Sequence, residues 1–184
     1  TKLLQIASLP FQYLGVPVFK SKPKDFHLQP LADKVKSKLS SWKASLLSIA
    51  GRVQLVKSVV QGMLIHCISI YNWPASIIKD IEKWIRNFIW SGHVNKKKLV
   101  TVAWKNVCKP YSEGDLGLSS LSCLNEAANM KLCWDLLHSE DFWAVLLRIR
   151  VLRHRRATDY HVSSSIWNTI KHQYSNIIKS LCYD

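Results

Sequence analysis

Lysine and arginine dominate the charged side chains of this chain. Its 184 residues hold 26 of them against 12 aspartates and glutamates, which gives a formal net charge of +14. Such an excess of positive charge attracts polyanions, first nucleic acid and second anionic membrane surfaces. The charge balance therefore predicts a partner rich in phosphate groups.

The cations gather in two stretches, one in the N-terminal third and one in the segment RIRVLRHRR. For the first set, phosphate contact is favoured over a merely solvated face. For the second set these two interpretations balance, and a basic nuclear-import signal competes with both. The first set is Lys20, Lys22, Lys24, Lys34, Lys36, Lys38, Arg52 and Lys57; the second is Arg148, Arg150, Arg153, Arg155 and Arg156.

Carboxylates show no pattern suited to catalysis. A nucleotidyl transferase needs two or three of them around two metal ions about 4 Å apart, and the sequence has no Asp-Asp or Asp-x-Asp pair. The looser pairs suit a helix face, a turn and a helix start; they are Asp80/Glu82, Glu113/Asp115 and Glu140/Asp141. We expect no catalytic residue, no metal site and no cofactor within this chain.

The five cysteines are odd in number, widely spaced and free of C-x-x-C. They predict reduced thiols in an intracellular protein, rather than disulfides or a zinc knuckle. The expected location is the nucleus and cytoplasm. The most apolar window, VVQGMLIHCISIYNW, is interrupted by Gln61 and His66 and is too short for a bilayer core of about 30 Å. We therefore expect a core helix there and no membrane partner.

The elements that must position these side chains are mostly helical. Apolar residues recur at intervals of three and four, which predicts helices over residues 30–48, 51–71, 74–89, 121–136, 142–152 and 166–181. Residues 9–19 predict a β-hairpin, because Gly15 permits a turn and Pro17 holds Val16 extended. The predicted fold is mainly α, a multi-helix bundle of five to seven helices with a small N-terminal β-hairpin.

One helix carries a narrow stripe of small residues. On a regular helical wheel, Gly51, Ser58, Gly62 and Ser69 share one face, and Gln54, Lys57 and Gln61 lie along its border. Small residues allow two helices to pack closely. They also allow a backbone to approach the minor groove of a duplex, with polar rim residues reaching sugars and phosphates. The sequence leaves both interpretations open.

Several segments, in order and over nearly the whole chain, resemble the C-terminal part of the reverse transcriptase of LINE-type, non-long-terminal-repeat retrotransposons of plants. They are LPFQYLGVPVFKSKPK, LSSWKASLLSIAGRVQLVKSVVQGML, YNWPASIIKDIEKWIRNFIWSG, VAWKNVCKPYSEGDLGL, LNEAANMKLCWDLL and SSSIWNTIK. The tripeptide YLG alone would be weak evidence, whereas the ordered set is specific to this family.

The resemblance implies a different role for each successive region of the chain. Tyr13, Leu14 and Gly15 would form the end-of-palm hairpin that supports the primer strand. Gly51, Arg52, Gln54, Lys57 and Ser58 would belong to a thumb that closes on the template–primer duplex. Residues 1–29 would be the hairpin and a basic linker, 30–92 the thumb-like region, and 93–184 a post-thumb region before a zinc-binding module. The family's catalytic aspartates, with Mg²⁺, would lie upstream of Thr1.

The sequence departs from the family at one turn, where Asp115 stands in place of the second glycine of Glu-Gly-Gly-Leu-Gly-Leu. If this position needs a positive φ, aspartate tolerates it better than most residues but at some cost. A decayed, unselected copy is therefore one possible source of the sequence.

The leading hypothesis is a non-catalytic fragment of an RNA-directed DNA polymerase that binds template and primer. Its partners would be an RNA template, an RNA–DNA hybrid, and the palm and fingers of the same polypeptide. The alternatives are a stand-alone helical interaction module and a translated retroelement fragment without function.

Overall fold

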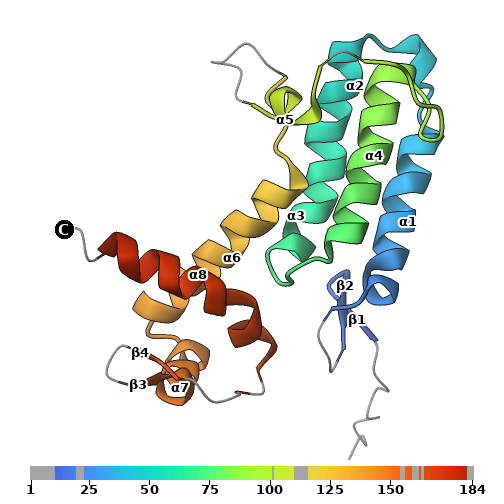
Figure 1. The fold of residues 1–184 in the computed structure, drawn as a ribbon. Helices are drawn as coiled ribbons and strands as arrows, with labels where there is room; N and C mark the ends of the chain where they lie inside the picture. Colours follow the sequence, from blue (N-terminus) through green and yellow to red (C-terminus); the bar gives the residue numbers. More distant parts are fainter. Residues whose placement is uncertain are drawn as a thin grey trace, which may run out of the picture.

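A computed structural model describes residues 11–19, 23–100, 102–109, 116–153, 156–158, 162 and 164–181. The chain is mainly α with a small antiparallel hairpin at its N-terminal end, as predicted. In Figure 1, helices α1 to α4 form one upright bundle, and a long helix, α6, leads from it to a second group with α7 and α8. The predicted limits between domains stay predictions.

The N-terminal hairpin pairs β1 (Phe11–Tyr13) with β2 (Val16–Val18). The two residues between them, Leu14 and Gly15, have φ values of 49° and 81°. Positive φ at both central positions is what a type I′ turn requires, and this turn matches the twist of the two strands. Val16 is buried, and the Tyr71 hydroxyl donates to the Pro17 carbonyl oxygen at 2.8 Å. The hairpin is therefore attached to the helical bundle.

Helix α1 (Asp25–Ser41) begins five residues before the predicted start at Pro30 and ends seven residues before Ser48. The prediction took the proline as a helix start, but Pro30 lies inside the helix. Leu28 adds one turn to the buried stripe and stabilises the longer start. At the other end, Leu46 is 79% exposed in a short 3₁₀ turn, η1 (Ala44–Leu46), so it is not part of the apolar face.

The predicted helix at residues 51–71 is three joined segments, α2 (Ile49–Leu55), a π-helical turn η2 (Val56–Gln61) and α3 (Gly62–Ile68). Its start is capped by Ser48, whose side chain accepts a hydrogen bond from the Gly51 N–H. The π turn uses i→i+5 bonds and holds an extra residue per turn. Regular 3.6-residue spacing could not show this irregularity.

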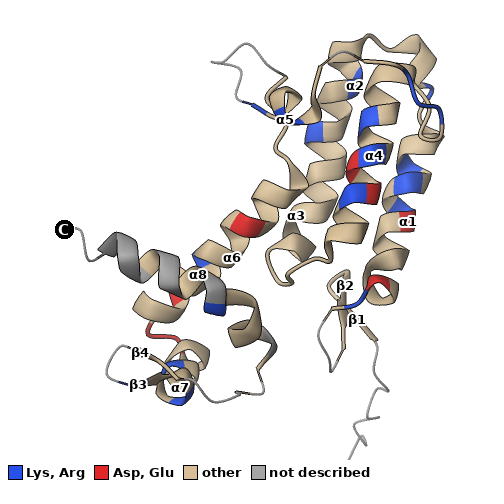
Figure 2. Cartoon of the chain, in the orientation of Figure 1, with Lys and Arg blue, Asp and Glu red and all other residues tan. Residues whose placement is uncertain are grey.

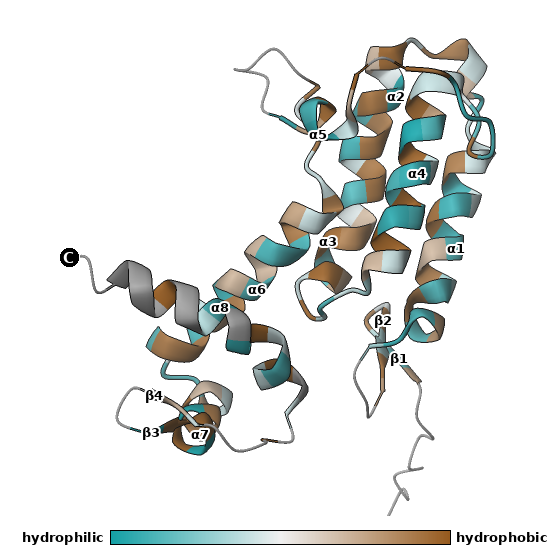
Figure 3. Ribbon diagram, in the orientation of Figure 1, coloured by the Kyte–Doolittle hydropathy of each residue, from teal (hydrophilic) through white to brown (hydrophobic). Residues whose placement is uncertain are grey.

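Helix α4 (Ala75–Ser91) follows Pro74 and ends at Gly92, which has a φ of 75°. Left-handed glycines commonly end helices in this way. Its buried stripe, including Ile81 and Phe88, packs on α1 and on α2, the first part of the rod formed by α2, η2 and α3. Figure 3 shows the alternation of apolar and polar residues along α1 and α4 that this packing requires.

Of the remaining elements, α5 (Trp104–Val107) packs with the first core through Val107, and the others contribute to a second, smaller core. These others are α6 (Leu121–His138), α7 (Phe142–Val151), α8 (Ser165–Leu181), and a two-stranded pair of β3 (Leu152–Arg153) with β4 (Arg156–Ala157). Leu121, early in α6, belongs to the first core, whereas Leu136 near its end packs with Trp167 of α8 in the second. Helix α6 therefore links two hydrophobic cores.

Candidate nucleic-acid interface

The tip of the N-terminal hairpin is open to solvent. Tyr13 is 64% exposed and Leu14 is 76% exposed. A leucine in the left-handed region costs on the order of 1–2 kcal/mol, and burial of its side chain does not offset this cost. A β-carbon added at Gly15 would meet no atom within 4 Å. Three residues that the resemblance assigns to the primer strand thus form one accessible tip.

Of the predicted lysines before α1, only Lys24 lies within the described residues, and Lys20 and Lys22 lie outside them. Lys24 is exposed at the N-cap of α1, and its backbone N–H donates to His27 Nδ1 at 3.1 Å. The backbone of Lys24 therefore helps to start the helix, while its side chain is exposed.

The stripe of small residues faces open space. Ser58, Gly62 and Ser69 are exposed, and a β-carbon at Gly62 would meet no atom within 4 Å. At Gly51 the nearest atoms belong to Leu47 and Ser48, in the turn just before the helix. Within the described residues, the exposure of Ser58, Gly62 and Ser69 leaves this part of the stripe without a covering helix, while Gly51 is half-buried. Close packing of two helices within this chain, one of the two interpretations of the stripe, is therefore not what the structure shows.

Polar side chains border the stripe, and hydrogen bonds to backbone carbonyls hold two of them, Ser58 and Gln61, in place. The Ser58 hydroxyl donates to the Gln54 carbonyl oxygen at 2.8 Å, and Gln61 Nε2 donates to the Ser119 carbonyl oxygen at 2.7 Å. A serine oxygen that donates in this way can still accept a hydrogen bond, for example from a sugar hydroxyl. Gln54 is exposed and Lys57 is half-buried. The border can contact sugars and phosphates while Gln61 anchors the helix to the segment before α6.

Arg52 has a structural task at the end of α4. Its Nε donates to the Ala44 carbonyl oxygen at 2.9 Å, and its Nη1 donates to the Ile89 carbonyl oxygen at 3.0 Å. The guanidinium also lies against Gly92, where an added β-carbon would be 3.5 Å from Cζ. A cation at the carbonyl end of a helix is favourable. Phosphate contact by Arg52 stays a prediction and would have to use its remaining N–H groups.

The second arginine cluster is divided between two environments. Arg148 of α7 donates from Nη1 to the Leu137 carbonyl oxygen at 2.8 Å and from Nη2 to the Ser139 carbonyl oxygen at 2.6 Å, at the end of α6. Arg150 on α7 and Arg153 on β3 are exposed. Arg148 thus joins α6 to α7, a role that the cluster of basic residues in the sequence did not indicate.

The basic residues of α1 and α4 form one surface, which was not predicted from the sequence. Figure 2 shows lysines and arginines on the outward sides of both helices. Lys36 Nζ lies 5.0 Å from the ring centroid of Trp84, which joins the two helix faces by a cation–π contact. Glu82, also on α4, accepts from the Ser120 hydroxyl and the Leu121 N–H, both at 2.9 Å, and so caps α6. The signal in the sequence was the spacing of Lys79, Lys83 and Arg86.

The buried thiols are unsuited to nucleophilic chemistry at neutral pH. Burial raises the pKa of Cys67 and of Cys133 to about 11 in each case, so both stay protonated. Among the described residues, no three histidine, cysteine or acidic side chains lie together as metal ligands would. Within the same residues, no helix has both the length and the apolar character needed to cross a membrane.

Two curated proteins of Arabidopsis thaliana are similar to the chain. The "Putative ribonuclease H protein At1g65750" is 30% identical over 170 residues, which cover 90% of this chain and 26% of that protein. The "Uncharacterized mitochondrial protein AtMg00310" is 27% identical over 113 residues, which cover 59% of this chain and 73% of that protein. No family model and no solved structure matches the chain.

The chain is thus related to plant proteins, one of which is named for ribonuclease H, and it spans only 26% of that relative's length. These relatives are compatible with the plant retroelement origin that the sequence segments imply. The finer assignment, to a particular part of a polymerase, stays a prediction.

Proposed function

We propose that this chain is the part of a plant LINE-type reverse transcriptase that grips the template–primer duplex and carries no catalytic group of its own. It binds an RNA–DNA hybrid through sugar and phosphate contacts, without reading the sequence of bases. The hairpin tip supports the primer strand, and α2, η2 and α3 act as a thumb. Phosphoryl transfer, with Mg²⁺, belongs to the palm and fingers of the parent polypeptide.

The observation that supports this proposal most strongly is the uncovered face of the η2–α3 region. The helical region η2–α3 buries one side in the first hydrophobic core and leaves Ser58 and Gly62 exposed on the other. A β-carbon added at Gly62 would meet no atom within 4 Å. A π turn within a helix is often found at functional sites, and this one includes Lys57, Ser58 and Gln61. Small residues with a polar border suit the close approach of a sugar–phosphate backbone.

A bulky residue at Gly62 tests this proposal. At Gly62 an added β-carbon meets no atom within 4 Å, and Gly62→Leu gains helix propensity, so the fold should be kept or slightly stabilised, by up to about 1 kcal/mol. The same side chain would occupy the surface where the duplex backbone lies. We expect a loss of affinity of about tenfold or more for a labelled blunt-ended RNA–DNA hybrid in fluorescence anisotropy, equivalent to about 1.4 kcal/mol.

Two controls accompany this measurement. Gly62→Ala should bind nearly as the parent chain does, and Ala127→Leu places the same new side chain at an exposed position of α6 away from the stripe. Unchanged hybrid affinity in Gly62→Leu, with a native circular dichroism spectrum, would refute the proposed duplex contact. Affinity that does not fall with rising salt would also contradict it, because phosphate contacts release counterions.

A further inference from the structure

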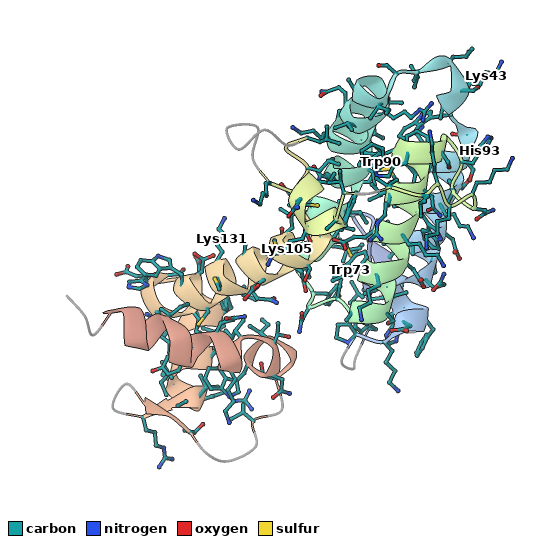
Figure 4. The ribbon with its side chains drawn as sticks, turned by 45° about the horizontal axis from the view of Figure 1, so that its top comes forward. Lys43, Trp73, Trp90, His93, Lys105 and Lys131 are labelled. Atoms are coloured by element: carbon teal, nitrogen blue, oxygen red, sulfur yellow. The ribbon has the colours of Figure 1, made fainter. Side chains whose placement is uncertain are left out.

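A cleft of about 410 Å³ lies between α4 and the segment that leads from the end of this helix to α5. Four of its lining residues are cations, and no aspartate or glutamate lines it. Lys83 and Arg86 come from α4, whereas Lys97 and Lys98 come from the segment; Trp90 and Trp104 supply aromatic walls. Figure 4 labels Trp90 near the end of α4 and Lys105 on α5, the two elements that flank this α4 cleft.

The segment that carries Lys97 and Lys98 is tied to α4 at both of its ends. Near its beginning, Asn87 Nδ2 donates to the Val94 carbonyl oxygen at 2.8 Å, and the Ser91 hydroxyl donates to the Lys96 carbonyl oxygen at 2.7 Å. Near its far end, the Arg86 guanidinium lies 5.3 Å from the ring centroid of Trp104. The four cations are therefore brought together by the fold rather than by chance proximity of loose side chains.

All four cations of the α4 cleft are exposed, so water and salt screen their mutual repulsion while their positive potential stays open to an anion. Among the described residues, none of the four forms an ion pair with a carboxylate. A solvated helix face would spread its charges over a convex surface. A cleft lined by cations and tryptophans instead resembles a groove for an anion that also carries flat aromatic rings.

We infer that the α4 cleft binds single-stranded nucleic acid. The four cations hold successive phosphates, and the tryptophan walls contact bases, which are exposed in a single strand but hidden inside a duplex. This site differs from the stripe around Gly62 in its residues and in the form of nucleic acid that it takes. The inference does not depend on duplex binding by the stripe, so each site can fail its test separately.

The test compares two double variants of equal charge in the whole chain. Lys97→Ala/Lys98→Ala removes two exposed cations of the cleft, and Lys131→Ala/Lys171→Ala removes two exposed lysines of α6 and α8. The probe is a fluorescein-labelled oligouridylate of about 12 nucleotides, a length that single-strand-binding folds cover. We expect the cleft variant to lose affinity about tenfold, and its slope of log affinity against log salt to fall by about 1.4, or about 0.7 per phosphate contact.

The control variant should keep nearly the full affinity and slope, and Gly62→Leu should bind the oligouridylate as the parent chain does. Equal losses in the two double variants would overturn the inference, because general charge attraction would then explain binding. Unchanged binding in Lys97→Ala/Lys98→Ala would also overturn it. A larger loss for the blunt-ended hybrid than for the oligouridylate in this variant would assign the cleft to duplex and reject the single-strand assignment.

Discussion

At the scale of residues, two arginines show that a basic side chain can be needed more by the fold than by a polyanion. Arg52 and Arg148 each donate two hydrogen bonds to carbonyl oxygens. Those of Arg52 include a carbonyl at the end of α4, and those of Arg148 lie at the end of α6. The last carbonyls of a helix lack partners within it, and the helix dipole is negative there. A guanidinium supplies both donors and positive charge, so each arginine joins a helix end to a neighbouring element.

Arg148→Ala should therefore lower the free energy of unfolding by about 2 kcal/mol, since it removes two charge-assisted hydrogen bonds at a half-buried site. Arg153→Ala is the matched control, because Arg153 is exposed, and its change should stay within about 0.5 kcal/mol. Urea denaturation followed by circular dichroism measures both. If Arg148→Ala weakened nucleic-acid binding with no loss of stability, Arg148 would be a contact residue instead.

At the scale of elements, the π turn η2 divides one long helical rod into two regular parts. Val56 and Val60 are buried within it, while Ser58 is exposed. A π turn acts as a single inserted residue, which lets the residues on either side keep their faces toward the core. The rod thus retains its packing on α4 while presenting a widened, irregular turn on the stripe side.

Deletion of Ser58 tests this description of η2. Removal of one residue should convert the π turn to regular helix and leave α3 in its present orientation, so most of the stability should remain. Deletion of the exposed Asp80 from the regular helix α4 should instead rotate all later residues by about 100° and expose Phe88 and Ile89. Thermal unfolding followed by circular dichroism compares the two. Equal losses of stability would show that η2 is not an inserted residue.

At the scale of the whole molecule, α6 connects two hydrophobic cores and is held to the first by polar contacts. Asn125 is buried, accepts from the Trp73 N–H at 3.2 Å and donates to the Tyr71 carbonyl oxygen at 2.9 Å. Glu82 holds the start of the same helix. From Cys133 on, the buried residues of α6 belong to the second core, together with those of α7 and α8. Each core can therefore be weakened separately.

We expect Leu136→Ala to speed amide exchange in α7, α8 and the last turns of α6 more than in α1 and α4. Leu136 is fully buried in the second core, and loss of its side chain costs about 2–5 kcal/mol there. Leu64→Ala, at an equally buried position of the first core, should show the reverse pattern. Hydrogen exchange with mass spectrometry resolves the two groups. Uniform acceleration in both variants would indicate one cooperative unit.

The sequence by itself determined the features that depend on neighbours along the chain. Apolar spacing indicated the helices, Gly15 and Pro17 indicated the hairpin, and composition gave the net charge. Helix ends were less predictable, because the prediction took Pro30 as a helix start although it lies inside α1. The side chains of the stripe were also evident in the sequence, since they recur along one helix.

Only the tertiary structure decided which of these side chains are exposed to solvent and which form hydrogen bonds with other segments. Arg52 meets the Ile89 carbonyl across 37 residues, and Gln61 meets the Ser119 carbonyl across 58. The α4 cleft likewise needs α4 and the segment after it to converge on one space. The physical reason is that helical periodicity is set by local hydrogen bonds, whereas the partners of a side chain are set by packing between segments far apart in the chain.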